Sequence, residues 1–474
     1  MRGSDRVDDL YWMSATELAR LMRTGELSAV EVLDAHLKRI QAVNPTLNAI
    51  VTLTEDQARA DAAAADARHA AGEDLGLLHG LPIAHKDLAD TAGVRTTGGS
   101  PLYVDRIPTA DALVVERAKS AGAISIGKSN TPEFGAGSQT FNEVFGATAN
   151  PYDTGRTCGG SSGGAAVALA SGMVPLADGS DMGGSLRNPA SFCNVVGLRP
   201  SPGRVPAWPK SDAWSHLSTE GPMGRTVDDV ALLLAAQAGP DPRSPIALET
   251  PGADFVPPVG TPDHGLRIAW APDLGGLPID PAVRTALAGV PGTFEALGHH
   301  VAEAAPDLSD AREVFSTLRA WSFALGLSGE FERHHDALKE TVIWNVELGR
   351  TMPMLDHQRA WRLREQLYQR TVAFFNVYDI LLCPVAQVPP FPLDVEYPTE
   401  IDGEVFETYI DWMRVCTDVT VMNVPALSMP AGFTDAGLPI GVQIVGPPRR
   451  DDLVLSVARQ FESVNDAGTR RPPL

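Results

Sequence analysis

The chain has 474 residues, of which 44% are hydrophobic, and this is the composition of an ordinary globular protein with a sizeable core. Its formal net charge of −21 argues against binding to the phosphate backbone of nucleic acids and against docking on anionic membranes. Because residues 1–10 are polar and no apolar run reaches the length of a membrane span, the sequence predicts a cytoplasmic protein.

Helices and short strands alternate along the chain. Capping boxes at Ser14–Glu17 and Ser28–Glu31 begin the first two predicted helices. The second helix has one apolar face, formed by Val30, Leu33, Leu37 and Ile40. Further helical regions are predicted at 55–72, 110–121, 308–376 and 451–464, and strands at 123–126, 195–198, 266–270, 380–382 and 440–445. This alternation predicts a layered α/β fold.

Two stretches rich in proline are predicted as loops. Residues 239–265 combine proline, glycine and aspartate, as surface crossings do, and residues 384–403 carry many prolines and acids. Glycine and serine concentrate instead in residues 78–205, which makes this the stretch where chemistry is expected.

One motif in this region is misleading. Residues 122–129 match the phosphate-binding loop pattern, which requires a strand before the loop and a helix after it. Here a helix precedes the motif, its interior is typical of a strand, and Pro132 follows too closely for a helix to continue from Lys128. Nucleotide binding is therefore not predicted.

Three elements carry residues suited to acyl-transfer chemistry. Gly159–Gly164 and Asp181–Arg187 are dense in glycine and serine, and glycines beside a serine let backbone N–H groups converge on one point, as an oxyanion hole requires. Lys86 follows an apolar strand, where desolvation lowers the pKa of an amine. Taken singly, the glycine runs also fit flexible turns, and the lysine fits an ion pair at a strand end.

Together these elements resemble the signature of the amidase signature family. The run Gly159–Pro200 follows that signature through nearly its whole length. The spacings also match, with 24 residues from Ser161 to Ser185 and 99 from Lys86 to Ser185. Further matches are HGLPIAHKD from His79, NTPEFG from Asn130, GPMGRTVDD from Gly221 and GLPIGVQIVG from Gly437. The resemblance covers almost the whole chain.

The resemblance implies a fold and a set of roles. The fold is a single domain over residues 1–474 with a mixed β-sheet sandwiched between layers of helices, a signature core at about 78–205 and a more variable region at about 240–410. Ser185 is the nucleophile, Ser161 relays the proton after a cis peptide bond, and Lys86 is the base. The backbone N–H groups of four consecutive residues form the oxyanion hole: Met182, Gly183, Gly184 and Ser185. Three residues support this geometry: Ser162, Asp181 and Arg187.

The proton relay is chemically coherent without the resemblance. A serine hydroxyl is a weak nucleophile until a base takes its proton, and a neutral lysine can act as that base. His85 adjoins Lys86, but adjacent residues of a strand point to opposite faces. The histidines and the four cysteines show no metal-ligand spacing and no C-x-x-C pair, so reduced thiols are expected and neither a metal nor a cofactor is predicted.

Among members of this family, the chain is similar to bacterial aryl acylamidases and to urethanases, which cut carbamates. The expected substrate is a small amide, anilide or carbamate, and four residues are expected to line its pocket: Gly135, Ala136, Gly137 and Arg204. Tight packing of Ala136 and a solvated loop charge at Arg204 are equally open.

Three alternatives remain at this point. A general amidase without carbamate activity fits the same residues. A tRNA-linked amidotransferase subunit fits less well, because residues 201–226 lack that subunit's tyrosine–glycine and alanine–serine-rich stretch. A non-enzymatic interaction module is disfavoured by the intact Lys86, Ser161 and Ser185. The sequence leaves the choice between monomer and homodimer open.

Overall fold

The computed structural model describes residues 10–262 and 264–474, and an eleven-stranded mixed sheet crosses them. In order across the sheet, the strands are β1 (Ile50–Leu53), β3 (Ile124–Ser129), β2 (Pro82–Lys86), β6 (Leu176–Asp181), β8 (Thr219–Gly224), β7 (Val196–Arg199), β14 (Ala426–Phe433), β15 (Pro439–Val445), β11 (Ile380–Pro384), β9 (Arg267–Trp270) and β10 (His300–Glu303). Strand β2 runs parallel to β3 and β6, whereas β8 runs antiparallel to β6 and β7. The predicted mixed sheet is confirmed.

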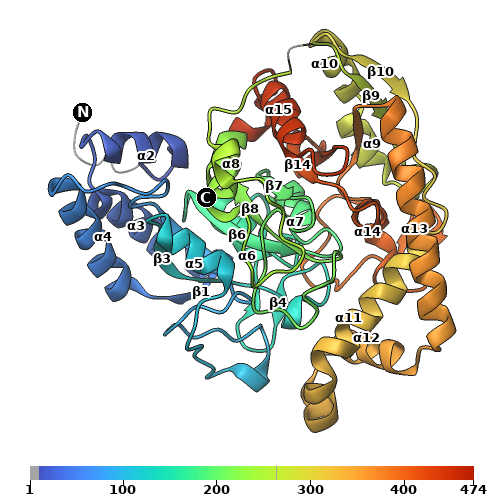
Figure 1. Cartoon of the computed structure of the whole chain (residues 1–474), viewed down its shortest axis with the longest axis horizontal. Coiled ribbons are helices and arrows are strands. Elements are labelled where there is room, and N and C mark those ends of the chain that lie inside the picture. The colour runs from blue at the N-terminus through green and yellow to red at the C-terminus, as the bar shows by residue number, and fades with distance from the viewer. Residues whose placement is uncertain (1–9, 263) are drawn as a thin grey trace.

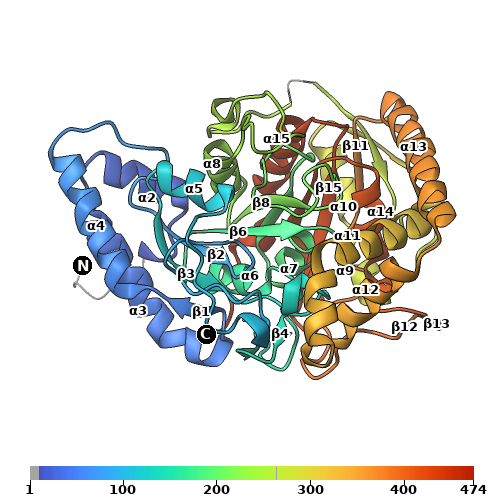
Figure 2. The same ribbon diagram turned by 60° about the horizontal axis from the view of Figure 1, so that its bottom comes forward.

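Helices flank the sheet, as predicted. They are α2 (Ala15–Arg23), α3 (Ala29–Leu47), α4 (Glu55–Ala70), α5 (Leu113–Ser120), α6 (Gly163–Ala170), α7 (Arg187–Phe192), α8 (Val227–Gln237), α9 (Pro281–Leu287), α10 (Val290–Ala296), α11 (Ala311–His334), α12 (Glu340–Thr351), α13 (Met354–Val377), α14 (Arg414–Val421) and α15 (Asp451–Glu462). Helices α2–α4 lie at one end of the molecule and α11–α13 at the other, with the sheet between them (Figures 1 and 2).

Short elements complete the chain. The 3₁₀ turns are η1 (Pro101–Tyr103), η2 (Glu133–Gly135), η3 (Gly252–Phe255), η4 (His335–Ala337), η5 (Asp411–Met413) and η6 (Asp466–Thr469). Two small hairpins pair β4 (Phe141–Asn142) with β5 (Gly146–Ala147), and β12 (Glu400–Ile401) with β13 (Glu404–Val405). Within their described residues, the predicted loops at 239–265 and 384–403 hold little regular structure beyond η3, β12 and the last residue of β11.

The two predicted capping boxes differ. At α3 both bonds form: Glu31 N donates to Ser28 Oγ at 3.1 Å, and Ser28 N donates to the Glu31 carboxylate at 2.9 Å. At α2 Ser14 Oγ accepts from Glu17 N, but the Glu17 carboxylate pairs with Arg20 at 2.9 Å instead of returning to Ser14. The ion pair with Arg20 thus replaces the second hydrogen bond of the capping box at α2.

The misleading phosphate-loop motif forms strand β3, as its strand-like interior indicated. Lys128 is fully buried, and its Nζ donates to Thr91 Oγ1 at 2.8 Å and to the Ala89 carbonyl. The four cysteines are buried and free. Across residues 10–262 and 264–474, no helix combines the length with the apolar character that crossing a membrane requires.

The sheet topology brings the chemistry-bearing segments to one edge. Because β2 and β6 are parallel neighbours, their carboxyl ends, at Lys86 and Asp181, lie at the same edge of the sheet. Strand β8 runs the other way, so its first residues, Thr219 and Glu220, pair with Asp181 and Ser180. Clefts at the carboxyl ends of parallel strands are common ligand sites in α/β proteins.

Candidate active site

Lys86, the last residue of β2, connects three hydroxyl groups. Its Nζ lies 2.7 Å from Ser161 Oγ, 2.9 Å from Ser162 Oγ and 3.1 Å from Ser180 Oγ. The lysine side chain and both serines of the Gly159–Gly164 loop are buried. The structure therefore brings Lys86 and Ser161 into direct contact, and it adds Ser180, which sequence reasoning missed.

Burial lowers the pKa of Lys86 from its ordinary value, because an ammonium ion loses solvation there. The carboxylates of Glu220, Asp181 and Asp178 oppose this shift without cancelling it. His85 bonds the Asp178 carboxylate rather than a serine of the loop, so the histidine beside Lys86 points away from the relay, as expected. The net effect is a pKa of about 8, so the neutral amine becomes available a little above neutral pH.

The loop that carries Ser161 is held by hydroxyl groups of residues 138–140. The Gly160–Ser161 peptide bond is cis, as the family resemblance implied. Ser138 Oγ donates to the Gly160 carbonyl and Thr140 Oγ1 to the Gly159 carbonyl, both at 2.9 Å. Asn188 Nδ2 in turn donates to Ser138 Oγ at 3.0 Å. Since Asn188 lies in α7, shortly after Ser185, these bonds fix the two serine segments against each other.

Ser185 lies in the turn between β6 and α7. Its carbonyl accepts from Ser162 N at 3.1 Å, and its side chain is partly exposed, unlike the buried Lys86 and Ser161. Among the residues that the structure describes, no hydrogen bond occupies the Ser185 hydroxyl. The structure therefore shows no hydrogen bond between Ser161 and Ser185, although catalytic hydrogen bonds are often long before a substrate binds.

The turn before Ser185 is anchored by the Asp181 carboxylate. Its oxygens accept from Gly184 N at 2.9 Å and from Leu186 N at 3.1 Å. The Gly184 N–H, expected as an oxyanion donor, is therefore already bonded to a carboxylate. Within residues 10–262 and 264–474, no hydrogen bond occupies the N–H groups of Met182, Gly183 or Ser185. These three are the donors that the turn leaves for an oxyanion.

Two buried arginines neutralise Asp181. Arg187 donates to its carboxylate at 2.9 and 3.0 Å, and Arg199 donates to its backbone carbonyl. Burial alone would raise the pKa of Asp181, but the two guanidinium groups outweigh it and hold that pKa below its usual value. Arg187 also reaches Gln443 Oε1 at 2.6 Å and the Cys416 carbonyl at 3.1 Å, so it links the turn to β15 and α14.

The predicted pocket segment 135–137 lies beside the relay. A Cβ atom at Gly135 would stand 3.4 Å from Ser161 Oγ. Ala136 is fully buried in an apolar group, here called the α11–α12 pocket cluster, which consists of Ala136, Phe323, Leu338, Val342 and Val346. Partly buried Met182 packs against this cluster. The predicted oxyanion turn and the predicted pocket segment thus meet.

Polar contacts fasten α11 and α12 to this segment. Lys339 N, just before α12, donates to the buried Glu133 carboxylate at 2.7 Å. In α11, Arg319 Nη1 donates to Met182 Sδ at 3.3 Å. Sequence reasoning missed both contacts, since neither Glu133 nor Arg319 stands in a motif whose spacing indicates a partner more than a hundred residues away.

Arg204 lies in a different environment from the other pocket residues. Its Nε forms a buried ion pair with Asp451 at 3.0 Å, and its guanidinium lies over the Phe255 ring. Its hydrogen bonds and ion pairs within the described parts of the chain include neither Lys86 nor Ser185. The structure thus brings Gly135 and Ala136 to the site but gives Arg204 no such contact there.

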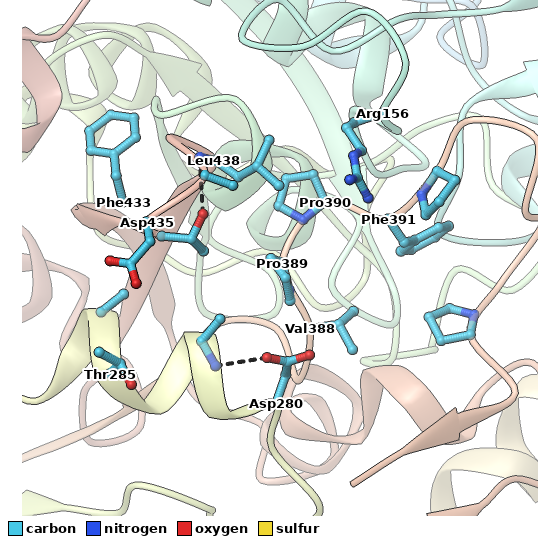
Figure 3. Close-up of a pocket in the computed structure, with 16 residues that line it drawn as sticks. Arg156, Asp280, Thr285, Val388, Pro389, Pro390, Phe391, Phe433, Asp435 and Leu438 are labelled. Atoms are coloured by element: carbon cyan, nitrogen blue, oxygen red, sulfur yellow. Dashed lines mark hydrogen bonds between the residues drawn. The ribbon is translucent and has the colours of Figure 1, made fainter.

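The structure also holds a surface groove of about 500 Å³ between the start of α9, residues 388–392 and the β14–β15 hairpin (Figure 3). Neither Lys86 nor either serine of the relay lines it. Two carboxylates line it, Asp280 and Asp435, and Asp280 accepts from Ala282 N at 2.7 Å and caps α9. The role of the Asp280 carboxylate in this structure is therefore to cap the helix.

Comparison with known proteins identifies the family. The Amidase family model matches residues 31–455, and the chain therefore belongs to the amidase family. An acylamidase of Rhodococcus erythropolis is 37% identical over 472 residues, covering 98% of this chain and 98% of that protein. A glutamyl-tRNA(Gln) amidotransferase subunit of Rhodopirellula baltica is 35% identical, covering 97% of this chain and 98% of that protein.

Solved structures agree with the fold. A bacterial aryl acylamidase of the amidase signature family superposes with a TM-score of 0.89 at 28% identity, covering 97% of this chain and 99% of that chain. A 6-aminohexanoate cyclic dimer hydrolase gives a TM-score of 0.88 at 28% identity, covering 98% of this chain and 99% of that chain. The resemblance inferred from sequence motifs is confirmed.

The glycine before Ser185 generates a stability prediction. Gly184 has a φ of +105°, and a Cβ atom there would lie 2.7 Å from Cys416 Cβ. Gly184→Ala should lower the free energy of unfolding by about 2–5 kcal/mol, combining backbone strain with overpacking. Gly72→Ala is the matched control, because Gly72 also has a positive φ but nothing within 4 Å of an added Cβ, and it should cost about 1–2 kcal/mol. Urea denaturation measures both losses, and equal losses would contradict the steric explanation.

Proposed function

We propose that this protein hydrolyses C–N bonds of small amides and anilides, and also of low-molecular-weight carbamates, through a covalent intermediate on Ser185. The observation that carries the proposal is the 2.7 Å contact between buried Lys86 Nζ and Ser161 Oγ. A lysine with a lowered pKa can take a proton from the serine beside it. The next residue, Ser162, donates its backbone N–H to the Ser185 carbonyl at 3.1 Å, so the segment that carries Ser161 lies against the turn that carries Ser185.

The first half of the reaction forms the covalent intermediate. Lys86 takes the Ser161 proton as Ser161 takes that of Ser185, and the Ser185 oxygen bonds to the substrate carbonyl carbon. The carbonyl electrons move to its oxygen, which accepts hydrogen bonds from the N–H groups of Met182, Gly183 and Ser185. When the C–N bond breaks, the relay returns its proton to the leaving nitrogen. An amide yields an amine and an acyl-enzyme, and a carbamate that breaks at the C–N bond yields an amine and an alkoxycarbonyl-enzyme. A carbamate that breaks at its ester C–O bond instead releases its alcohol, which takes the proton of the relay, and leaves a carbamoyl-enzyme.

The second half repeats the relay with water as the nucleophile. Water gives its proton through Ser161 to Lys86 and bonds to the carbonyl carbon of the intermediate. The Ser185–carbon bond then breaks, and Ser185 recovers a proton. An alkoxycarbonyl-enzyme releases a carbonic acid monoester, which loses CO₂ to give the alcohol, and a carbamoyl-enzyme releases a carbamic acid, which loses CO₂ to give the amine. All of these steps use groups of this chain and water alone.

The relatives favour amide chemistry. Two of the similar proteins are an acylamidase and an aryl acylamidase, and a third is a hydrolase of a 6-aminohexanoate cyclic dimer. Similarity to amidotransferase subunits is nearly as high, at 35% identity. A stand-alone hydrolase is still favoured, because residues 201–226 lack the stretch typical of those subunits. A panel of anilides, primary amides including glutamine, esters and carbamates separates these functions.

The α11–α12 pocket cluster is proposed to receive the apolar part of the substrate. It contains Ala136 and Phe323 and reaches Met182 at the oxyanion turn. Gly135 leaves space beside Ser161, where a larger residue would crowd the hydroxyl. An aryl amide whose ring lay in this cluster would have its carbonyl carbon near Ser185. Arg204, with its guanidinium paired to Asp451, is not proposed to contact the substrate.

Removing the two serines tests the relay. Ser185→Ala should fold normally and lose turnover by on the order of a thousandfold or more, because the covalent intermediate cannot form. Ser161→Ala should lose at least about a hundredfold, since the proton path is interrupted. Residues acting as a unit are not additive, so the double variant should be little worse than Ser185→Ala. Initial rates on one anilide measure all three, and wild-type-like rates in Ser185→Ala would end the assignment.

The pH dependence tests the base. Lys86 must lose its proton to act, so activity should rise with pH as the lysine deprotonates, giving an acid-side fall and an optimum above neutral pH. Lys86→Arg keeps the positive charge but cannot deprotonate, and it should be inactive across the range. Steady-state kcat/KM between about pH 5 and 10 measures this, a range that spans the titration of a lysine with a lowered pKa. Survival of the acid limb in Lys86→Arg would contradict the role of the lysine.

The size of residue 136 tests the pocket. Ala136→Phe should suppress turnover of bulky aryl amides more than that of acetamide-sized ones, because the added ring fills space in the α11–α12 pocket cluster. Ala136→Gly should spare or improve the bulky substrates. The measured quantity is the ratio of kcat/KM for the two substrates, which is insensitive to the folded fraction. An unchanged ratio would place the substrate elsewhere.

Carbamate cleavage is tested separately. Nitrogen and oxygen both donate into a carbamate carbonyl, so attack depends on a well-stabilised oxyanion, and each donor contributes roughly 3 kcal/mol. Aromatic amine release from a methylene dianiline dicarbamate should accompany cleavage of a matched anilide. If the anilide is cleaved well and no amine leaves the carbamate, the protein is an amidase without urethanase activity.

A further inference from the structure

Glu220 is a carboxylate near the relay that the proposed reaction does not use. It is the second residue of β8, and its antiparallel partner in β6 is Ser180. Residues directly opposite each other in an antiparallel pair extend their side chains on the same face of the sheet. Ser180 Oγ lies 3.1 Å from Lys86 Nζ, so Glu220 extends on the face of the sheet where the Lys86 amine lies.

The other carboxylates that face Lys86 are already compensated. Asp178 accepts hydrogen bonds from His85 and from the Lys86 backbone N–H. Asp181 is paired with Arg187 and Arg199. Glu220 differs from both, because no residue that the structure describes donates a hydrogen bond to its half-buried carboxylate.

The electrostatics of the two groups are reciprocal. Burial lowers the pKa of Lys86, and among the carboxylates that oppose this shift Glu220 acts most strongly. Burial raises the pKa of Glu220, and Lys86 is the strongest group opposing that shift. The remaining charged groups that face Glu220 are Asp178 from β6 and Lys210 from the loop before β8. Lys210 Nζ donates to the Ser215 and Ser218 carbonyls at 3.2 and 3.0 Å, which holds it in that loop.

We propose that Glu220 is a positioning residue that acts through Lys86, its carboxylate stabilising the ammonium ion that forms when the lysine receives the proton of the relay. This inference rests on the proposed role of Lys86 as the base. A lysine with burial alone would be neutral but a weak proton acceptor. A negative charge nearby, without a direct hydrogen bond, strengthens it as an acceptor while leaving it deprotonated above neutral pH.

Glu220→Gln separates this role from a structural one. The substitution keeps the shape of the side chain and removes the charge, so Lys86 should lose its proton more readily. The acid limb of kcat/KM should move to lower pH by about one unit or more, as for a lysine that loses a nearby opposite charge. The rate on the alkaline plateau should fall severalfold, because the base is weaker. Damage to the fold would instead lower the rate at every pH without moving the limb.

Two further variants complete the design. Glu26→Gln changes the net charge by the same amount at a side chain that is 58% exposed, in the segment between α2 and α3, and its limb should coincide with that of the wild type. Glu220→Asp keeps the charge on a shorter side chain, and its limb should lie between those of the wild type and Glu220→Gln. The Asp variant also serves as the test if the Gln variant does not fold.

A second measurement does not require turnover. An aryl sulfonyl fluoride modifies an activated serine, so the pH dependence of Ser185 labelling, followed by mass spectrometry, reports the same proton relay. The labelling limb should shift to lower pH in Glu220→Gln as the kinetic limb does. A limb that stays in place in folded Glu220→Gln, by either measurement, overturns the proposal for Glu220 while wild-type turnover still supports the hydrolase. Absence of turnover on the whole panel defeats the proposed function, and absence of Ser185 labelling as well defeats both.

Discussion

The burial of Lys86 at the carboxyl end of β2 is the constraint on which the site depends. An ammonium ion is costly to bury, so burial shifts the protonation equilibrium of Lys86 toward the neutral amine and lowers its pKa to about 8. Its direct neighbours are three hydroxyl groups, Ser161, Ser162 and Ser180, which can donate or accept and so satisfy the lysine in either protonation state. A carboxylate bonded directly to the amine would hold it charged. The two β6 carboxylates do not bond the amine, because Asp178 pairs with His85 and Asp181 pairs with two arginines.

A second constraint explains why so many buried polar side chains surround the serine loops. The backbone N–H and carbonyl groups of these loops lie outside helices and strands, so they need hydrogen-bond partners elsewhere in the protein. Ser138 and Thr140 bond the carbonyls of one loop, and Asp181 bonds the N–H groups of the other. The geometry of the relay is thus held by hydrogen bonds from segments on either side of it rather than by the loops themselves.

Much of this was predictable from the sequence, and the omissions have two causes. The mixed sheet with flanking helices, the cis bond after Gly160 and the Lys86–Ser161 contact follow from motifs whose spacing is local or matches a known pattern. Sequence reasoning missed β6, β8 and β14, which contain glycine or proline and lack a clear alternation. It also missed β1 and β10, which have only four residues each. Contacts from α11, such as that of Arg319 with Met182, depend on packing between distant segments, which spacing cannot reveal.

The α11–α12 pocket cluster has a consequence for how such a protein can diverge. In the proposed function, the relay and the oxyanion turn come from residues 86–185, whereas most of the cluster proposed to receive the substrate comes from residues 323–346, a separate stretch of the chain. Substitutions on the inner faces of α11 and α12 can reshape the space for a substrate without touching a hydrogen bond of the relay. Under the proposed function, the substrate range of this protein can therefore change through substitutions in one helical hairpin while the residues of the relay stay the same.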